Sequence, residues 1–333
     1  MNKDIQNIAI VRLSALGDII NSAVVLQFIK KEYPNANITW ICEEMFSSIL
    51  KDHHYLKNLH TLTLKELKKR DNKIKVFIEN LKKISTFEEF DIIIDMQGLI
   101  KSAIVSRIIG KKTHGFDKNS TRESLASLLY KTSSSIPYEE NVIKRNCFVV
   151  SDALKFKITD EMILNKDNIF NYTNDFKFSK DNKNIAFIIG ASWNSKKYPK
   201  ELVTKVCDTL GETSYIVWGS EDERKDALWI CEQSKYAKLA PKMSLKKLVG
   251  FISELDLVIG NDTGPTHIAW AQNIPSITLF GPTNERMIYE TPKNIAINSP
   301  SNVNILKIDK NDFSIKEIDY KEIVKNAQRL LKW

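Results

Sequence analysis

The sequence predicts an α/β protein built from two Rossmann-like domains that face each other across a cleft. Short apolar runs alternate with amphipathic helical segments along most of the chain, which is typical of parallel sheets covered by helices on both faces. A polar stretch from Thr159 to Asn184 interrupts this alternation. The chain has 333 residues, which is long for one core and suits two domains.

The first series of elements predicts an N-terminal domain over residues 1–160. Its strands are apolar runs, and its helices carry apolar residues at helical spacing. The predicted strands are Ile8 to Leu13, Ile38 to Cys42 and Phe90 to Met96. The predicted helices are Asp18 to Glu32, Asn72 to Ser85, Gly98 to Ile109 and Arg122 to Tyr130.

The second series predicts a C-terminal domain over residues 161–333. Its predicted strands are Ile185 to Ile189, Tyr215 to Trp218, Leu255 to Ile259, Ser276 to Phe280 and a last one near Val303 to Ile308. Its predicted helices are Lys200 to Leu210, Glu221 to Ser234, Ser244 to Glu254, one that begins near Pro265, and Asp319 to Leu331. For this last helix, packing within its own domain and packing back on the N-terminal domain both remain open.

Composition excludes several classes of protein. No apolar run approaches the roughly 20 residues of a membrane span, and no signal-peptide pattern precedes the first strand, so we expect a cytoplasmic protein. The cysteines form no CxxC pair and have no neighbouring histidine, which indicates reduced, mostly buried thiols and no zinc site. They are Cys42, Cys147, Cys207 and Cys231.

Two basic clusters lie in the N-terminal half of a chain whose net charge is +8. Lys57 to Lys83 holds nine basic and three acidic residues, and Lys101 to Arg122 holds six basic and one acidic. Such clusters favour a polyanion or an anionic membrane surface. A solvated helix face is the alternative, and it fits Lys57 to Lys83 better than Lys101 to Arg122. They lack interleaved aromatic residues and match no nucleic-acid-binding motif, so we expect no nucleic acid partner.

The segment from Leu255 to Thr283 contains two turns that each follow a predicted strand. Asp262, Thr263, Gly264 and Pro265 start a helix, and Gly281-Pro282-Thr283 is expected to repeat this arrangement after the next strand. The free N–H groups and positive end of such helices suit phosphate, so the segment predicts a nucleotide diphosphate site. The alternative is that Asp262 and Thr263 only cap a helix.

The first strand is followed by Asp18, in the segment Arg12 to Ile20. A dinucleotide-binding protein carries GxGxxG there, but only Gly17 is present. A carboxylate at this turn argues against bound phosphate and is a candidate general base for a substrate hydroxyl. An N-cap aspartate without a chemical role is the alternative.

Five segments together resemble the lipopolysaccharide heptosyltransferases, an inverting glycosyltransferase family with the GT-B fold. Within that family, QGLIKSA and RESLAS are more similar to heptosyltransferase I, which transfers heptose from ADP-heptose to Kdo of lipid A, than to heptosyltransferase II. The five segments are RLSALGDII from Arg12, DMQGLIKSA from Asp95, TRESLAS from Thr121, KKYP from Lys196 and NDTGPTH from Asn261.

The resemblance implies a role for each candidate residue. Asp18 matches the catalytic base that deprotonates the Kdo hydroxyl. Ser192 and Lys196 match contacts to the donor phosphates, and a lysine offsets charge on departing ADP. Asp262 matches a residue that holds the heptose hydroxyls, while Thr263 and Gly264 offer N–H groups to the diphosphate.

Further matches concern the rest of the donor and the acceptor. His267 is one turn into the same helix and within reach of the phosphates, or else it is structural. Glu221 matches the position that binds the ribose, with Glu223 close enough to compete. Lys101 and Arg122 match basic positions that receive the carboxylate and phosphates of Kdo-lipid A. The implied location is the cytoplasmic face of the inner membrane, with peripheral contact to its anionic surface.

No DxD triplet occurs in the chain, so the sequence predicts neither a metal site nor a cofactor. Lys196 and the helix N–H groups would stabilise the leaving group instead. Two other classes of function remain: a nicotinamide-dependent oxidoreductase, which the missing GxGxxG disfavours, and a non-catalytic module that binds a nucleotide sugar or nucleic acid. The oligomeric state is open.

Overall fold

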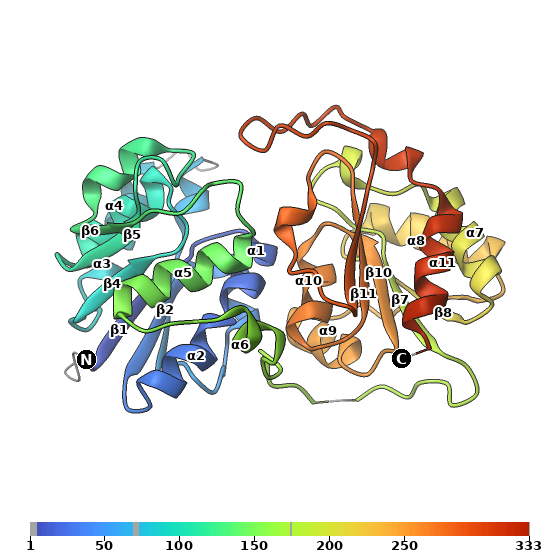
Figure 1. The fold of residues 1–333 in the computed structure, drawn as a ribbon, viewed down its shortest axis with the longest axis horizontal. Helices are drawn as coiled ribbons and strands as arrows, with labels where there is room; N and C mark the ends of the chain where they lie inside the picture. Colours follow the sequence, from blue (N-terminus) through green and yellow to red (C-terminus); the bar gives the residue numbers. More distant parts are fainter. Residues whose placement is uncertain (1–4, 69–72, 174, 333) are drawn as a thin grey trace. The chain divides into compact units, whose positions relative to one another are not determined.

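The computed structural model describes residues 5–68, 73–173 and 175–332, and it divides into two compact units. The first comprises residues 1–171 and the second residues 172–333, so the division falls inside the polar stretch noted above. Each unit holds one six-stranded sheet in which all neighbouring strands are parallel. The expected α/β class is confirmed (Figure 1).

The first sheet has the strand order β3-β2-β1-β4-β5-β6. Apolar, β-branched runs form its central strands, and these are buried on both faces as expected for a parallel sheet. The structure adds three short strands, β3, β5 and β6, to the three that the sequence predicts. The strands are β1 (Asn7–Val11), β2 (Asn37–Glu43), β3 (Asn58–Leu62), β4 (Ile92–Asp95), β5 (Thr113–Phe116) and β6 (Thr132–Ser134).

Helices cover both faces of this sheet. The predicted helix Asp18 to Glu32 is divided into α1 and α2, and the predicted helix Arg122 to Tyr130 is the 3-10 helix η3. Asn72, where we expected the next helix to begin, lies outside the described residues, as do residues 69–71 of the first basic cluster. The helices are α1 (Leu16–Ser22), α2 (Val25–Glu32), η1 (Glu44–Ile49), η2 (Leu64–Lys68), α3 (Lys73–Ile84), α4 (Ile100–Ile109), η3 (Ser124–Leu129), α5 (Val142–Leu154) and α6 (Asp160–Leu164).

The second sheet has the order β12-β11-β10-β7-β8-β9, which is the same topology when counted from the first strand of its unit. Its strands are β7 (Asn184–Ile188), β8 (Thr213–Val217), β9 (Ala237–Leu239), β10 (Leu257–Asn261), β11 (Ser276–Phe280) and β12 (Asn294–Asn298). Its helices are η4 (Asn194–Lys196), α7 (Lys200–Leu210), α8 (Glu221–Gln233), α9 (Leu245–Ile252), α10 (Gly264–Ala271), η5 (Glu285–Met287), η6 (Ser314–Glu317) and α11 (Tyr320–Leu330).

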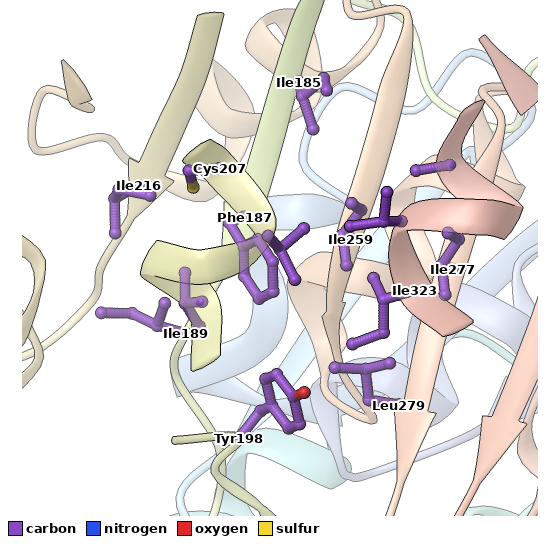
Figure 2. Packing of buried hydrophobic residues seen from close by; sticks show 14 of the residues in the cluster. Ile185, Phe187, Ile189, Tyr198, Cys207, Ile216, Ile259, Ile277, Leu279 and Ile323 are labelled. Carbon is purple, nitrogen blue, oxygen red and sulfur yellow. The ribbon is translucent and has the colours of Figure 1, made fainter. Parts of the chain in front are cut away.

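In the second unit, α9 and α10 lie on one side of the sheet, and α7, α8 and α11 lie on the other (Figure 1). The last helix, α11, packs against α7 and β11 of its own unit. Figure 2 shows the core between the sheet and the helices α7 and α11, in which Ile323 of α11 and Cys207 of α7 approach Phe187 and Ile259. Each of these four side chains is at most 1 % exposed.

The predicted last strand, Val303 to Ile308, is wrong, because this segment is irregular and β12 is the last strand instead. Asn294 anchors β12 by donating its amide to the Ile274 carbonyl and the Ser276 hydroxyl. In the later segment, Asn304 accepts from the N–H groups of Leu306 and Lys307, and an Asx turn of this kind competes with strand pairing.

The prediction of a second strand-to-helix turn at Gly281-Pro282-Thr283 is also wrong. The chain after β11 is irregular and leads only to the three-residue 3-10 helix η5, which is too short to provide an anion site. A Cβ atom at Gly281 would lie 2.7 Å from the Cβ of Ile315. Glycine is therefore needed here for close packing against η6.

In both sheets the strand order reverses at an equivalent point, and the candidate residues lie at these two points. The strand order changes between β1 and β4 in the first unit and between β7 and β10 in the second. In doubly wound sheets, ligands bind beyond the carboxyl ends of the strands at this switch point. Asp18 follows β1, Lys196 follows β7 and Asp262 follows β10, so all three lie at such points.

Candidate functional site

Asn261, the last residue of β10, fixes the loop that follows β7. Its side-chain amide donates to the carbonyls of Ile189 (3.0 Å) and Gly190 (3.2 Å), and its Oδ1 accepts from the Tyr198 N–H (3.0 Å). The loop between Gly190 and Tyr198 contains Lys196 in η4. One buried amide therefore holds Lys196 beside the start of α10.

Asp262 is the centre of a buried polar cluster. The Nζ of Lys196 lies 2.5 Å from its Oδ2, and the Thr283 hydroxyl donates to the same oxygen at 2.8 Å. The Nε2 of His267 lies 3.1 Å from its Oδ1. The side chains of Lys196 and Asp262 are only 8 % and 4 % exposed.

The charge state of this cluster follows from its contacts. Burial alone would raise the pKa of Asp262, but the Lys196 ammonium and the bonded His267 outweigh burial and hold the pKa well below its ordinary value. The cluster thus keeps an ionised carboxylate beside a buried ammonium. Asp262 takes one of the three N–H donors of Lys196, and the others remain available to an anion.

The start of α10 presents free backbone donors. Thr263 is the N-cap residue, but its side chain makes no capping bond, and Pro265 occupies the first turn. Within the described part of the chain, the N–H groups of Thr263 and Gly264 have no hydrogen-bond acceptor. The structure therefore brings five of the predicted donor residues together: Lys196, Asp262, Thr263, Gly264 and His267.

Ser192 and Glu221 are less closely tied to this cluster. Ser192 is exposed in the loop after β7, and Glu221 is exposed as the first residue of α8. Glu223 instead caps α8, since its Oε2 accepts from the N–H groups of Gly219 (2.7 Å) and Ser220 (3.2 Å). Among the described residues, the carboxylate of Glu221 makes no such capping contact.

In the first unit, Asp18 pairs with a buried arginine. Nη2 of Arg12 lies 3.0 Å from Oδ1 of Asp18, whose side chain is 27 % exposed. Asp18 is the third residue of α1, and its Oδ2 accepts from the Ala15 N–H at 3.2 Å. It contributes to the capping of α1 without being the N-cap residue, and it remains accessible to solvent.

The turn after β4 is joined to the turn that carries Asp18. The Oε1 of Gln97 accepts from the Leu13 N–H at 2.8 Å, and Arg12 also donates to the Met96 carbonyl. Beneath this turn, Asp95 accepts from the Gln97 N–H (2.8 Å) and the Tyr130 hydroxyl (2.8 Å). The DMQG segment therefore supports the turn that holds Asp18.

Lys101 and Arg122 differ in how they are held. The Nζ of Lys101, whose side chain is 40 % exposed, lies 2.7 Å from Oε1 of Glu43, which is 2 % exposed. Arg122 is exposed and, among the described residues, makes no hydrogen bond or ion pair. The acidic residues nearest to Arg122 in the sequence are engaged elsewhere: Glu123 accepts from the Ile100 N–H, and Asp117 accepts from the N–H groups of Asn119 and Ser120.

Four residues of these networks were not predicted from the sequence: Arg12, Glu43, Asn261 and Thr283. Each stands at the end of a strand or just beyond one and lies next to a predicted site residue in space. Its place relative to a strand end was therefore the one clue in the sequence to its role in the site. In residues 5–68, 73–173 and 175–332, no group of three or more His, Cys, Asp or Glu side chains has the arrangement of a metal site. Over the same ranges, no helix has the length and apolar character needed to cross a membrane.

Comparison with known proteins identifies the family. The model of glycosyltransferase family 9 (heptosyltransferase) matches residues 79–314. Lipopolysaccharide heptosyltransferase 1 of Campylobacter coli is 37 % identical over 342 residues, which cover 97 % of this chain and 98 % of that protein. The chain belongs to glycosyltransferase family 9. The resemblance drawn from the five sequence segments is thus confirmed, and the protein is a glycosyltransferase.

Other members of glycosyltransferase family 9 support the same placement. Lipopolysaccharide heptosyltransferase 1 of Pseudomonas aeruginosa is 26 % identical over 83 % of this chain and 79 % of its own length. The structure of E. coli heptosyltransferase WaaC with ADP-2-deoxy-2-fluoro heptose matches with a TM-score of 0.80 and 21 % identity, covering 97 % of this chain and 99 % of that one. The predicted GT-B fold is confirmed by this likeness, and a nicotinamide-dependent oxidoreductase is excluded.

Proposed function

We propose that this glycosyltransferase is a heptosyltransferase I, which transfers L-glycero-D-manno-heptose from ADP-heptose to Kdo of lipid A with inversion at the anomeric carbon. The observation that carries the proposal is the 37 % identity to the Campylobacter coli heptosyltransferase 1 over nearly the full length of both chains. The polar clusters at the two switch points supply the chemistry that this reaction needs.

Asp18 acts as the base on the acceptor side. In a single displacement, the Kdo hydroxyl attacks the anomeric carbon, the hydroxyl proton passes to a carboxylate, and the C–O bond to ADP breaks. Arg12 holds the carboxylate of Asp18 through one oxygen. Arg122 and Lys101 bind the carboxylate and phosphates of the acceptor.

The cluster around Asp262 serves the donor side. Lys196 and the free N–H groups of Thr263 and Gly264 stabilise the negative charge that develops on the departing diphosphate. Asp262 orients Lys196 and contacts the heptose hydroxyls. Ser192, in the loop that carries Lys196, and His267, in helix α10, contact the phosphates. Glu221 binds the ribose. These groups replace the metal ion that other glycosyltransferases use.

Mass spectrometry of a reaction with ADP-heptose and Kdo₂-lipid A tests the proposal. The expected product carries one added heptose, and an acceptor that already carries the first heptose should remain unchanged. Transfer only to the second acceptor would indicate a heptosyltransferase II. No transfer to either, with intact binding of DNA or RNA that weakens with salt, would favour the non-catalytic alternative.

A further inference from the structure

We propose that α3, α4 and η3 of the first unit form a lipid-binding face whose apolar side chains insert into the surface of an anionic bilayer. This deepens the proposed function, in that a lipid-linked acceptor requires the enzyme to work at a membrane surface. The surface formed by these three elements is called the lipid-binding face below.

Exposed apolar side chains are concentrated on this face. Across the described residues, thirteen large apolar side chains are exposed, and eight of them lie on these three short elements. Scattered single apolar residues are normal on a protein surface, but a group of this size marks an interaction site. The eight are Ile74, Phe77, Ile78, Ile100, Ile104, Ile108, Leu125 and Leu128.

The two helices share one face of the sheet and so share one outer surface. Ile84 of α3 and Val105 of α4 pack into the same core cluster, against Ala9 and Val11 of β1. Because these positions point inward, the residues on the opposite sides of both helices point outward. On α4 the exposed isoleucines recur every four residues, which aligns them in one stripe.

Exposed cations border these apolar stripes. On α3 the exposed lysines flank the apolar positions, with Glu79 as the acidic exception, and α4 continues into two further lysines. Lysine and arginine stems lie along apolar surface while their charged ends reach out to headgroups. The exposed cations are Lys73, Lys75, Lys82, Lys83, Arg107, Lys111 and Lys112.

The charge identifies an anionic lipid surface as the occupant. A second copy of the chain packed symmetrically on this face would bring the same cations together, and like charges at an interface disfavour such a dimer. An anionic bilayer instead offers an apolar interior for the isoleucines and phosphate groups for the lysines. The first turn of α4 also carries Lys101, so an acceptor anchored in that bilayer would lie beside the proposed acceptor residues.

Vesicle flotation of the full chain tests this inference. The probes are vesicles that contain phosphatidylglycerol and vesicles of phosphatidylcholine alone. One variant carries Ile74→Ser and Phe77→Ser, and a second carries Ile104→Ser and Ile108→Ser. The matched control carries Leu306→Ser and Phe313→Ser, which removes two apolar side chains of similar exposure (53 % and 48 %) from the second unit.

The parent chain and the control should float with the phosphatidylglycerol vesicles, and each test variant should bind them at least about 10-fold more weakly. Two results would contradict insertion of the apolar side chains. One is that the test variants bind the vesicles as tightly as the parent chain, and the other is that salt releases the parent chain while the serine substitutions have no effect. A dimer of the parent chain that the serines dissociate would assign the face to self-association. Turnover of a detergent-dispersed acceptor should survive in the test variants, and vesicle binding without any heptose transfer would refute the proposed function alone.

Discussion

Removal of Lys196 should destabilise the second unit far more than removal of a comparable exposed lysine. Lys196→Ala leaves the Asp262 carboxylate buried without its counterion. Breaking a buried ion pair by removing one partner costs about 3–5 kcal/mol. In a unit of this size, each kcal/mol lowers the melting temperature by about 2–4 °C, so a fall of roughly 6–20 °C is expected.

Lys200→Ala provides the matched control within the same unit. Lys200 also forms an ion pair, with Asp226 at 2.9 Å, and its ammonium lies 5.0 Å from the ring of Trp229, much as Lys196 lies 5.1 Å from Trp193. The difference is exposure, which is 35 % for Lys200 against 8 % for Lys196. An exposed pair is worth at most about 1 kcal/mol, so this variant should melt within about 4 °C of the parent chain.

Calorimetry at several pH values gives a second test of the buried Lys196–Asp262 pair. The pKa of Asp262 is lower in the folded protein than in the unfolded chain. Its stabilising contribution is therefore present above the unfolded-chain pKa of about 3.9 and is lost as the pH falls below that value. The melting temperatures of the parent chain and Lys196→Ala should therefore converge on acidification. Equal melting of the Lys196 and Lys200 variants at neutral pH would refute the structural role of the buried pair.

Four further predictions concern the reaction and the residues proposed to bind its acceptor. Asp18→Asn should keep the fold and ADP-heptose affinity while turnover falls by roughly 10² or more; near-normal turnover would remove Asp18 from the mechanism. Excess EDTA should leave the rate almost unchanged, and a loss that Mg²⁺ restores would reveal a metal requirement. Arg122→Ala should raise the KM for Kdo-lipid A by roughly 10- to 100-fold, with the KM for ADP-heptose and the melting temperature unchanged. Lys101→Ala should also lower the melting temperature, because it leaves the buried Glu43 carboxylate without its counterion.

The sequence predicted the central strands and long helices because their patterns are local. Helix α7 and strand β11 begin and end where the apolar periodicity places them. The edge strands β3, β6 and β9 were missed because they are short and only partly buried, so they lack a strong apolar signal. The false strand at Val303 to Ile308 has such a signal, but no neighbouring strand pairs with it.

The candidate site shows the same limit at the level of side chains. Chain order identified Asp18 and Asp262, since each follows a predicted strand, and the family resemblance added Lys196. Their partners could not be predicted, because Arg12 meets Asp18 across a tight turn and Thr283 reaches Asp262 from the segment that follows the adjacent strand β11. These contacts depend on side-chain direction in the folded state, which sequence spacing does not determine.

Each unit holds its key carboxylate in a way that matches a different chemical task. Burial favours the protonated form of Asp262, but the Lys196 ammonium and the hydrogen bonds to this carboxylate outweigh burial and hold its pKa well below the ordinary value, so Asp262 is poorly suited to act as a base. Asp18 has one cationic partner and remains partly exposed, so its carboxylate is accessible to a bound hydroxyl. The environments of the two carboxylates therefore support assigning proton transfer to the first unit and leaving-group stabilisation to the second.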